Sequence, residues 1–194
     1  MNHSGIYKLT LLGFCLVFSA VAVSCEDEPP KEDDKNRIAR QLNESRFKSI
    51  YQQRDAQFLL QASELNLAEI QLGQLAQRKA YHADVKELGK MMVKFHSTSL
   101  SHLIELASDK SVFVATSPSA SSDNTTSNLN RKTGIRFDKA YCDLMIKDHR
   151  QAIEMFEKIA DNSHSDSDIR KWASATLQQL RTHLEYALMC REKI

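Results

Sequence analysis

Two segments of the sequence repeat the same spacing of methionine and histidine. Met92 precedes His96 by four residues, and Met145 precedes His149 by four residues. A helix turns once in about 3.6 residues, so side chains four apart lie on one face. An aliphatic residue and an alanine begin ten residues after each histidine and mark that face as buried. The repeat predicts two amphipathic helices that each carry a histidine at the same depth.

Four segments each have a buried face that contains a single ionisable side chain. These side chains are Glu69, His96, His149 and His183. In a bundle they would meet in the interior, where an isolated charge is costly. Three imidazoles and a carboxylate can hold a Zn, Fe, Mn or Cu ion, and Met92 or Met145 would add a soft donor for Cu(I). The alternative is a structural polar layer, in which Glu69 pairs with one protonated histidine and the other imidazoles hydrogen bond to backbone or water.

The residues before the histidines argue against a ferritin-type di-iron centre. Such a centre needs Glu-x-x-His on two helices and further glutamates, because bridging carboxylates hold the two irons. Val93, Ile146 and Leu180 lie three residues before the three histidines. Oxygen chemistry of the ferroxidase kind is therefore disfavoured. The sequence assigns no catalytic residue, and it leaves open whether the protein is an enzyme, with the balance toward a non-enzyme.

Helix-forming residues dominate the chain from about residue 50 onward, and no segment alternates with the period of a strand. Helices are predicted over residues 54–80, 82–108, 135–162 and 166–191. Their similar lengths predict an all-α, ferritin-like four-helix bundle over residues 51–194. Residues 109–133 contain little apolar surface and predict a long flexible loop between the second and third helices. Such a loop can run the length of the bundle, so an up-down-down-up arrangement is possible.

Two cysteines provide a geometric check on the last two helices. Cys142 precedes His149 by seven residues, and Cys190 follows His183 by seven residues. If the helices are antiparallel, pairing the cysteines places the two histidines at one level. We therefore predict a disulfide between Cys142 and Cys190, which would stabilise the fold by about 2 to 4 kcal/mol. Two inert buried thiols are the alternative.

The N-terminal residues predict export and a lipid anchor. An apolar run over residues 9–23 is too short to span a bilayer and suits a signal peptide over residues 1–24. Residues 22–25 resemble a bacterial lipobox, which would make Cys25 the acylated first residue. An ordinary secreted protein and an uncleaved anchor are the alternatives. Residues 25–50 predict an acidic tether and lead-in, which is either a spacer or a signal for surface display.

These features predict a lipoprotein of the cell envelope, attached to the outer membrane and facing either the periplasm or the cell exterior. Removing the signal peptide removes Lys8, so the formal net charge of +1 becomes zero. A neutral chain without a cluster of basic residues is not expected to bind nucleic acid. The membrane is thus the one partner that the sequence predicts.

Several phrases of the sequence resemble a bacterial envelope family, named domain of unknown function 4142. They lie at residues 67–76, 92–96, 137–141, 145–149 and 183–184, and the resemblance covers residues 54–189. The family's members are labelled outer membrane proteins and are expected to form ferritin-like bundles. The family's sequence pattern falls on the same four ionisable residues that the buried faces identify: Glu69, His96, His149 and His183. Phe95 departs from that pattern, because the family usually has an aspartate before the first histidine.

The family has no established activity, so the resemblance informs fold and location more than function. The leading hypothesis is a non-enzymatic binding module, or a structural or stress-related accessory, with a central layer of glutamate and histidine. The alternative is a metal-storage protein or a metal-dependent oxidoreductase that uses Glu69, His96, His149 and His183.

Overall fold

Six helices form the described part of the chain in a computed structural model, which describes Met1 and residues 32–194. They are α1 (Glu32–Arg46), α2 (Ile50–Lys79), α3 (Ala83–Asp109), α4 (Ala120–Asn130), α5 (Ile135–Ala160) and α6 (Ser167–Lys193). The described residues contain no strand, so the all-α prediction is confirmed. The four predicted helices correspond to α2, α3, α5 and α6. The predicted signal peptide, the predicted lipidation site Cys25 and the start of the predicted acidic tether lie outside the described residues.

Polar side chains define where the long helices begin. The Ser49 hydroxyl accepts a hydrogen bond from the backbone of Tyr51 and caps α2. The Asp166 carboxylate accepts from the backbone N–H groups of Asp168 and Ile169 and caps α6. These oxygens satisfy donors that have no partner inside the helix, which favours starting the helix at that residue.

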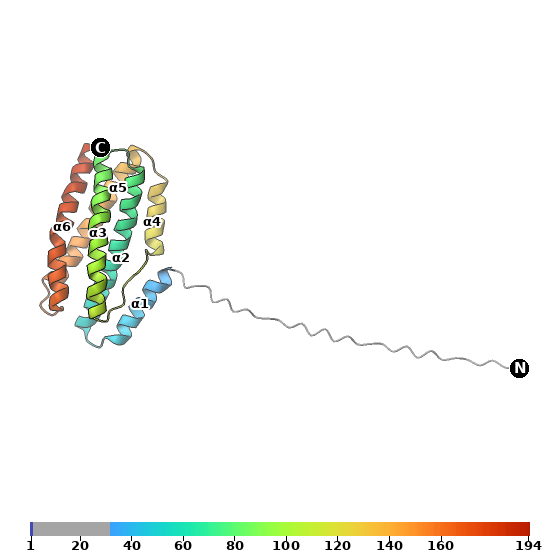
Figure 1. The fold of residues 1–194 in the computed structure, drawn as a ribbon, viewed down its shortest axis with the longest axis vertical. Coiled ribbons are helices and arrows are strands. Elements are labelled where there is room, and N and C mark those ends of the chain that lie inside the picture. Colours follow the sequence, from blue (N-terminus) through green and yellow to red (C-terminus); the bar gives the residue numbers. More distant parts are fainter. Residues whose placement is uncertain (2–31) are drawn as a thin grey trace.

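The four long helices form two antiparallel hairpins packed against each other (Figure 1). One hairpin is α2 with α3, and the other is α5 with α6. At one end Lys193 of α6 bonds to Asp84 of α3 at 2.7 Å, and at the other end Lys110 bonds to Asp166 at 2.8 Å. These contacts place α3 antiparallel to α6, which makes α3 parallel to α5. The bundle is therefore up-down-down-up, whereas the narrower label of a ferritin-like bundle stays a prediction.

The connection between α3 and α5 differs from the predicted flexible loop, because residues 120–130 form α4. This helix packs against α2 and α5 and buries Leu129. Its other anchors are polar: the Gln71 amide oxygen of α2 accepts from the Ser122 and Thr126 hydroxyls, and the Gln71 amide nitrogen donates to Asp123. Polar side chains thus hold a segment whose low apolar content predicted a loop.

The lead-in also contains more structure than a tether, since α1 packs against α2. Asn43 of α1 makes two hydrogen bonds to the backbone of Phe113, each 2.8 Å long. An amide side chain pairs with one peptide group in the same way as a neighbouring strand would. This pair fixes the beginning of the α3–α5 connection against α1.

Two glycines allow α2 and α3 to approach closely. A Cβ atom on Gly73 would lie 2.7 Å from the carbonyl oxygen of Gly89, and one on Gly89 would lie 2.8 Å from the carbonyl oxygen of Gly73. Both distances are shorter than van der Waals contact allows, so any side chain here would push the helices apart. The close crossing lies two helical turns before His96 and sets the depth of that histidine relative to α2.

Apolar residues fill the bundle on both sides of the histidine level. One cluster includes Met92, Tyr141 and Met145, and the other includes Phe58 and Phe156.

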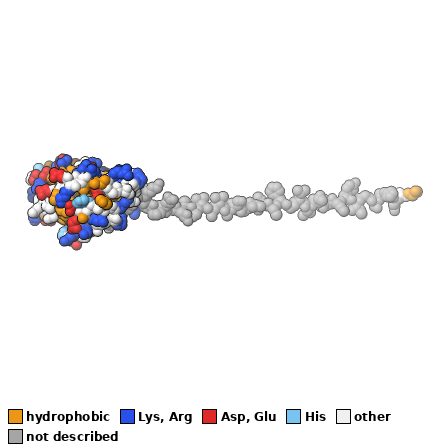
Figure 2. Space-filling model, turned by 90° about the horizontal axis from the view of Figure 1, so that it is seen from above, with side chains coloured by type: hydrophobic (Ala, Val, Ile, Leu, Met, Phe, Trp, Pro, Cys, Tyr) orange, Lys and Arg blue, Asp and Glu red, His pale blue; other side chains and the backbone are white. Residues whose placement is uncertain are grey.

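On the face seen in Figure 2, basic and acidic side chains are intermixed with hydrophobic ones. Within the described residues, none of the helices has the length and apolar character needed to cross a membrane.

Candidate functional site: a buried three-histidine centre

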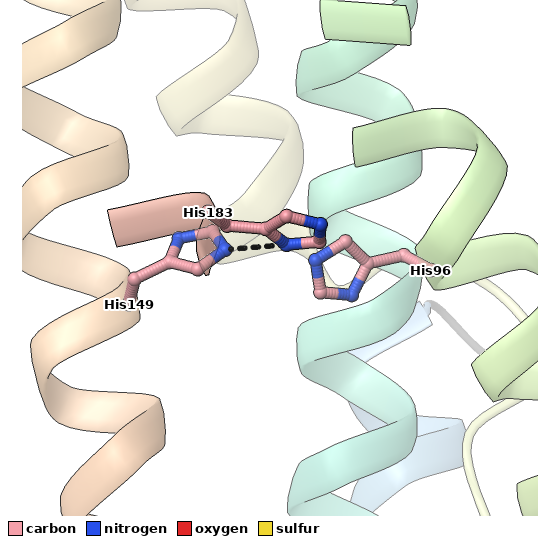
Figure 3. A group of neighbouring side chains, drawn as sticks. All are labelled: His96, His149 and His183. Atoms are coloured by element: carbon pink, nitrogen blue, oxygen red, sulfur yellow. Dashed lines mark hydrogen bonds between the residues drawn. The ribbon is translucent and has the colours of Figure 1, made fainter. Parts of the chain in front are cut away.

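Three of the four predicted residues meet in the interior of the bundle. His96 comes from α3, His149 from α5 and His183 from α6, and one nitrogen of each ring lies within 4.8 Å of the others (Figure 3). Their side chains are 1%, 1% and 2% exposed. The convergence follows from the spacing of the apolar faces and from the antiparallel pairing of α5 and α6.

Asn66 of α2 orients the His96 ring. The His96 Nδ1 atom lies 2.9 Å from the Asn66 side-chain oxygen, and the Asn66 amide nitrogen donates to the carbonyl of Ala62 at 2.8 Å. The Asn66 oxygen can only accept, so His96 carries its proton on Nδ1. Its Nε2 atom then has a free lone pair, is buried, and has no hydrogen-bond partner in the described structure. Figure 3 shows this side of the ring turned toward the other two histidines.

The same reasoning fixes the protons on His149 and His183. His149 donates from Nδ1 to the backbone carbonyl of Met145 at 3.0 Å, so its Nε2 is an acceptor. That Nε2 lies 3.3 Å from Nδ1 of His183, which must therefore be the donor. Moving the His183 proton to its other nitrogen would free a third lone pair beside the first two.

Burial keeps all three imidazoles neutral. It lowers the pKa of His149 to about 4 and that of His183 to about 3, and it lowers the pKa of His96 well below the usual range. A charge on His149 would also oppose protonation of His96 and His183, and a charge on His183 would oppose that of His96. A neutral imidazole is the form that binds a metal ion.

Glu69 is buried in the same core but is not part of the histidine group. Burial and the nearby Asp148 carboxylate raise its pKa well above the usual range, so the acid favours its neutral form. Its Oε2 atom has no hydrogen-bond partner among the described residues. Burial raises the pKa of the Tyr141 hydroxyl, and an ionised Glu69 would raise it further, so the two groups are close enough to interact. The predicted pairing of Glu69 with a protonated histidine is therefore not what the electrostatics favour.

Phe95 and Asn66 are the neighbours of the centre that the sequence did not assign. The Phe95 ring packs perpendicular to the rings of His96 and His183, with ring centroids 5.2 and 4.9 Å apart. Phe95 brings no oxygen to His96, and Asn66 supplies the oxygen that orients this ring. Asn66 lies four residues after Ala62 on the buried face of α2. A polar amide on a buried face is a signal in the sequence, but Asn66 is not ionisable and is therefore not among the predicted site residues.

The two cysteines lie side by side where α5 and α6 pack, in hydrogen-bonding contact as buried free thiols. That contact and burial raise the pKa of Cys142. The pairing agrees with the register that the seven-residue spacing predicts, since Cys142 meets Cys190 and His149 meets His183. The disulfide itself stays a prediction.

The protein is therefore an all-helical bundle of two hairpins that buries a group of three histidines in its interior. The chain belongs to the family described as "Domain of unknown function (DUF4142)", whose model matches residues 42–189. The resemblance drawn from the sequence phrases is thereby confirmed.

Among solved structures, the chain is similar to the crystal structure of a DUF305 fragment from Deinococcus radiodurans. The TM-score is 0.64 with 11% sequence identity, and the match covers 73% of this chain and 97% of the other. At this identity the likeness concerns the fold alone. No curated protein matches the chain at a significant level.

Proposed function

We propose that the protein binds a transition-metal ion at His96, His149 and His183. The observation that carries the proposal is the lone pair on His96 Nε2, which is buried, lacks a hydrogen-bond partner and faces two other neutral imidazoles. Leaving such an acceptor without a partner costs about 1 to 3 kcal/mol, and a metal ion would satisfy it.

The surroundings of the rings also suit a metal ligand. Histidines that bind metals usually donate their second N–H to an oxygen, which fixes the ring and increases its basicity. His96 donates to Asn66 and His149 donates to the Met145 carbonyl. A set of imidazoles without a carboxylate favours Zn, Cu or Fe over Mn, which prefers oxygen ligands. Because divalent copper and zinc generally bind such sites more tightly than divalent iron, we place Zn and Cu first among the four candidate ions.

A non-enzymatic role in holding or buffering such an ion is the function that these contacts support best. We further propose that the protein works at the cell envelope, attached to the outer membrane through a lipid on Cys25. This part rests on the signal peptide and lipobox pattern of residues 1–25. Mass spectrometry of the protein from its membrane fraction would test it, because acylation adds a defined mass to the peptide that begins at Cys25.

Metal content is the direct test of the centre. Protein purified without chelator is analysed for Zn, Cu, Fe and Mn, and the apoprotein is titrated with each ion by calorimetry. We expect one equivalent of Zn or Cu in the wild type. His96→Leu and His149→Leu should lose it, whereas His102→Leu, at an exposed position of the same helix as His96, should keep it.

The opposite result has a definite meaning. Folded wild-type protein that takes up none of the four ions in stoichiometric amount would leave the histidines as a structural polar layer. In that case the histidines would have a structural role, in which the hydrogen bond between His149 and His183 helps to hold α5 against α6.

A further inference from the structure

A groove between α3 and α6 reaches the histidine centre from the surface. Its volume is about 290 Å³, and six residues line it: Met91, Lys94, Phe95, Thr98, Gln179 and His183. His183 is thus both a member of the three-histidine group and part of the groove wall. The groove therefore ends beside the proposed metal position, on the side of His183.

Three protein donors leave a four-coordinate metal ion with one open position. Zinc and copper sites that keep such a position bind water or another small ligand there. Glu69 does not join the group, and among the described residues no other carboxylate does. For Cu(II) or Zn, which favour nitrogen and oxygen donors over the thioethers of Met92 and Met145, the position is open to a ligand from outside the protein.

The residues of the groove set the charge and size of that ligand. The six lining residues include one lysine, Lys94, and no acidic residue, and the Lys94 side chain is exposed. The bound metal ion adds further positive charge behind it. Phe95 makes perpendicular ring contacts with His96 and His183 and also lines the groove, so it lies where the groove meets the rings. The wall therefore favours a small anion and excludes a bulky one.

We propose that the metal centre binds a small monodentate anion that enters through the α3–α6 groove, guided by Lys94 and limited in size by Phe95. This inference rests on the proposed metal site. The anion donates a lone pair to the metal in place of solvent, and no electron or proton is transferred.

Azide binding to the Cu(II)-loaded protein provides the test, because an azide-to-copper charge-transfer band reports the bond directly. Metal stoichiometry and far-UV circular dichroism are measured first for every variant. Lys94→Met should weaken azide binding about two- to threefold at low ionic strength, with the difference decreasing as salt is added. Lys86→Met is the matched control, because Lys86 is also exposed on α3 but lies about 12 Å away along the helix.

Phe95→Ala tests the size limit with benzoate, a bulkier anion. Benzoate should compete with azide in this variant and not in the wild type. Phe113→Ala removes an exposed phenylalanine outside the groove and should behave as the wild type. Phe95→Leu retains most of the apolar volume, so it keeps the test valid if the alanine variant does not fold.

The outcomes separate the two proposals. Copper binding without an azide band, or an azide affinity that Lys94→Met leaves unchanged, overturns the anion site but not the metal site. Absence of stoichiometric metal in the folded wild type overturns both.

Discussion

Acidification should destabilise the metal-free protein through its buried histidines. In the unfolded chain a histidine has a pKa near 6.5, whereas burial lowers it to about 4 for His149 and about 3 for His183 in the folded protein. The folded state therefore binds fewer protons than the unfolded state below pH 6.5. The stability that these two neutral histidines contribute is therefore complete above pH 6.5 and is lost as the pH falls toward 4.

The size of the effect follows from these pKa values. Between pH 7 and pH 5 each of the two histidines should remove about 1.9 kcal/mol from the free energy of unfolding, or about 4 kcal/mol together. His96 acts in the same direction, because its pKa is also lowered. Glu69 and Asp148 act in the opposite direction, since their raised pKa values favour proton uptake on folding. A loss of this size is a large part of the 5 to 15 kcal/mol that is typical of a domain.

Single variants separate the histidine contribution from that of the acids. Urea unfolding is followed by circular dichroism and by the fluorescence of Trp172, the one tryptophan, at pH 5, 6 and 7 with chelator present. His183→Leu should reduce the loss between pH 7 and pH 5 by about 1.9 kcal/mol. His102→Leu, at an exposed position, is the control. If His183→Leu and the wild type lose the same stability, the assignment of a neutral buried imidazole at position 183 is wrong.

Three further substitutions or treatments test the fold around the centre. Asp138→Ala removes the acceptor of two backbone N–H groups in the α2–α3 link, so urea unfolding should show a loss of about 3 kcal/mol, and an unchanged midpoint would contradict this role. Gly89→Ala should lower the melting temperature, although alanine normally stabilises a helix by about 1 kcal/mol, because its Cβ would lie 2.8 Å from a carbonyl oxygen of α2. If Cys142 and Cys190 form the predicted disulfide, reduction should lower the stability by about 3 kcal/mol, and free thiols in non-reduced peptide mass spectra would refute the bond.

The sequence predicts the four long helices and the meeting of the histidines because both depend on local periodicity. Apolar residues at spacings of three and four define the buried face of each helix, and short links make consecutive helices antiparallel. The seven-residue offsets of Cys142 and Cys190 then fix the register of α5 against α6. The observed contact between His149 and His183 follows from these rules alone.

The parts that the sequence does not predict depend on contacts between distant polar residues. Helix α4 has little apolar periodicity and is held by Gln71, which lies about 50 residues earlier in the chain. The position of Glu69 depends on how far α2 slides along α3, and one residue of slide moves a side chain by about 1.5 Å along the axis. The close contact of Gly73 with Gly89 sets that slide. Neither the contact of Gln71 with α4 nor the contact of Gly73 with Gly89 can be recognised from one sequence without the fold.

The assignment of the imidazole protons is a third feature that only the structure provides. It depends on which oxygen each ring meets, and the two acceptors are of different kinds. Asn66 offers a side-chain oxygen from another helix, whereas Met145 offers a backbone oxygen from the same helix. A backbone acceptor leaves no mark in the residue types, so no pattern in the sequence indicates it.

The three histidines are divided between the two hairpins, with His96 in one and the other two in its partner. An ion coordinated by all of them would therefore join the hairpins in the same manner as a covalent cross-link. Separation of the hairpins would then require loss of the ion, so metal release and opening of the bundle would proceed as one event. The amide hydrogens of α3 should in consequence exchange with solvent more slowly in the metal-loaded protein than in the apoprotein.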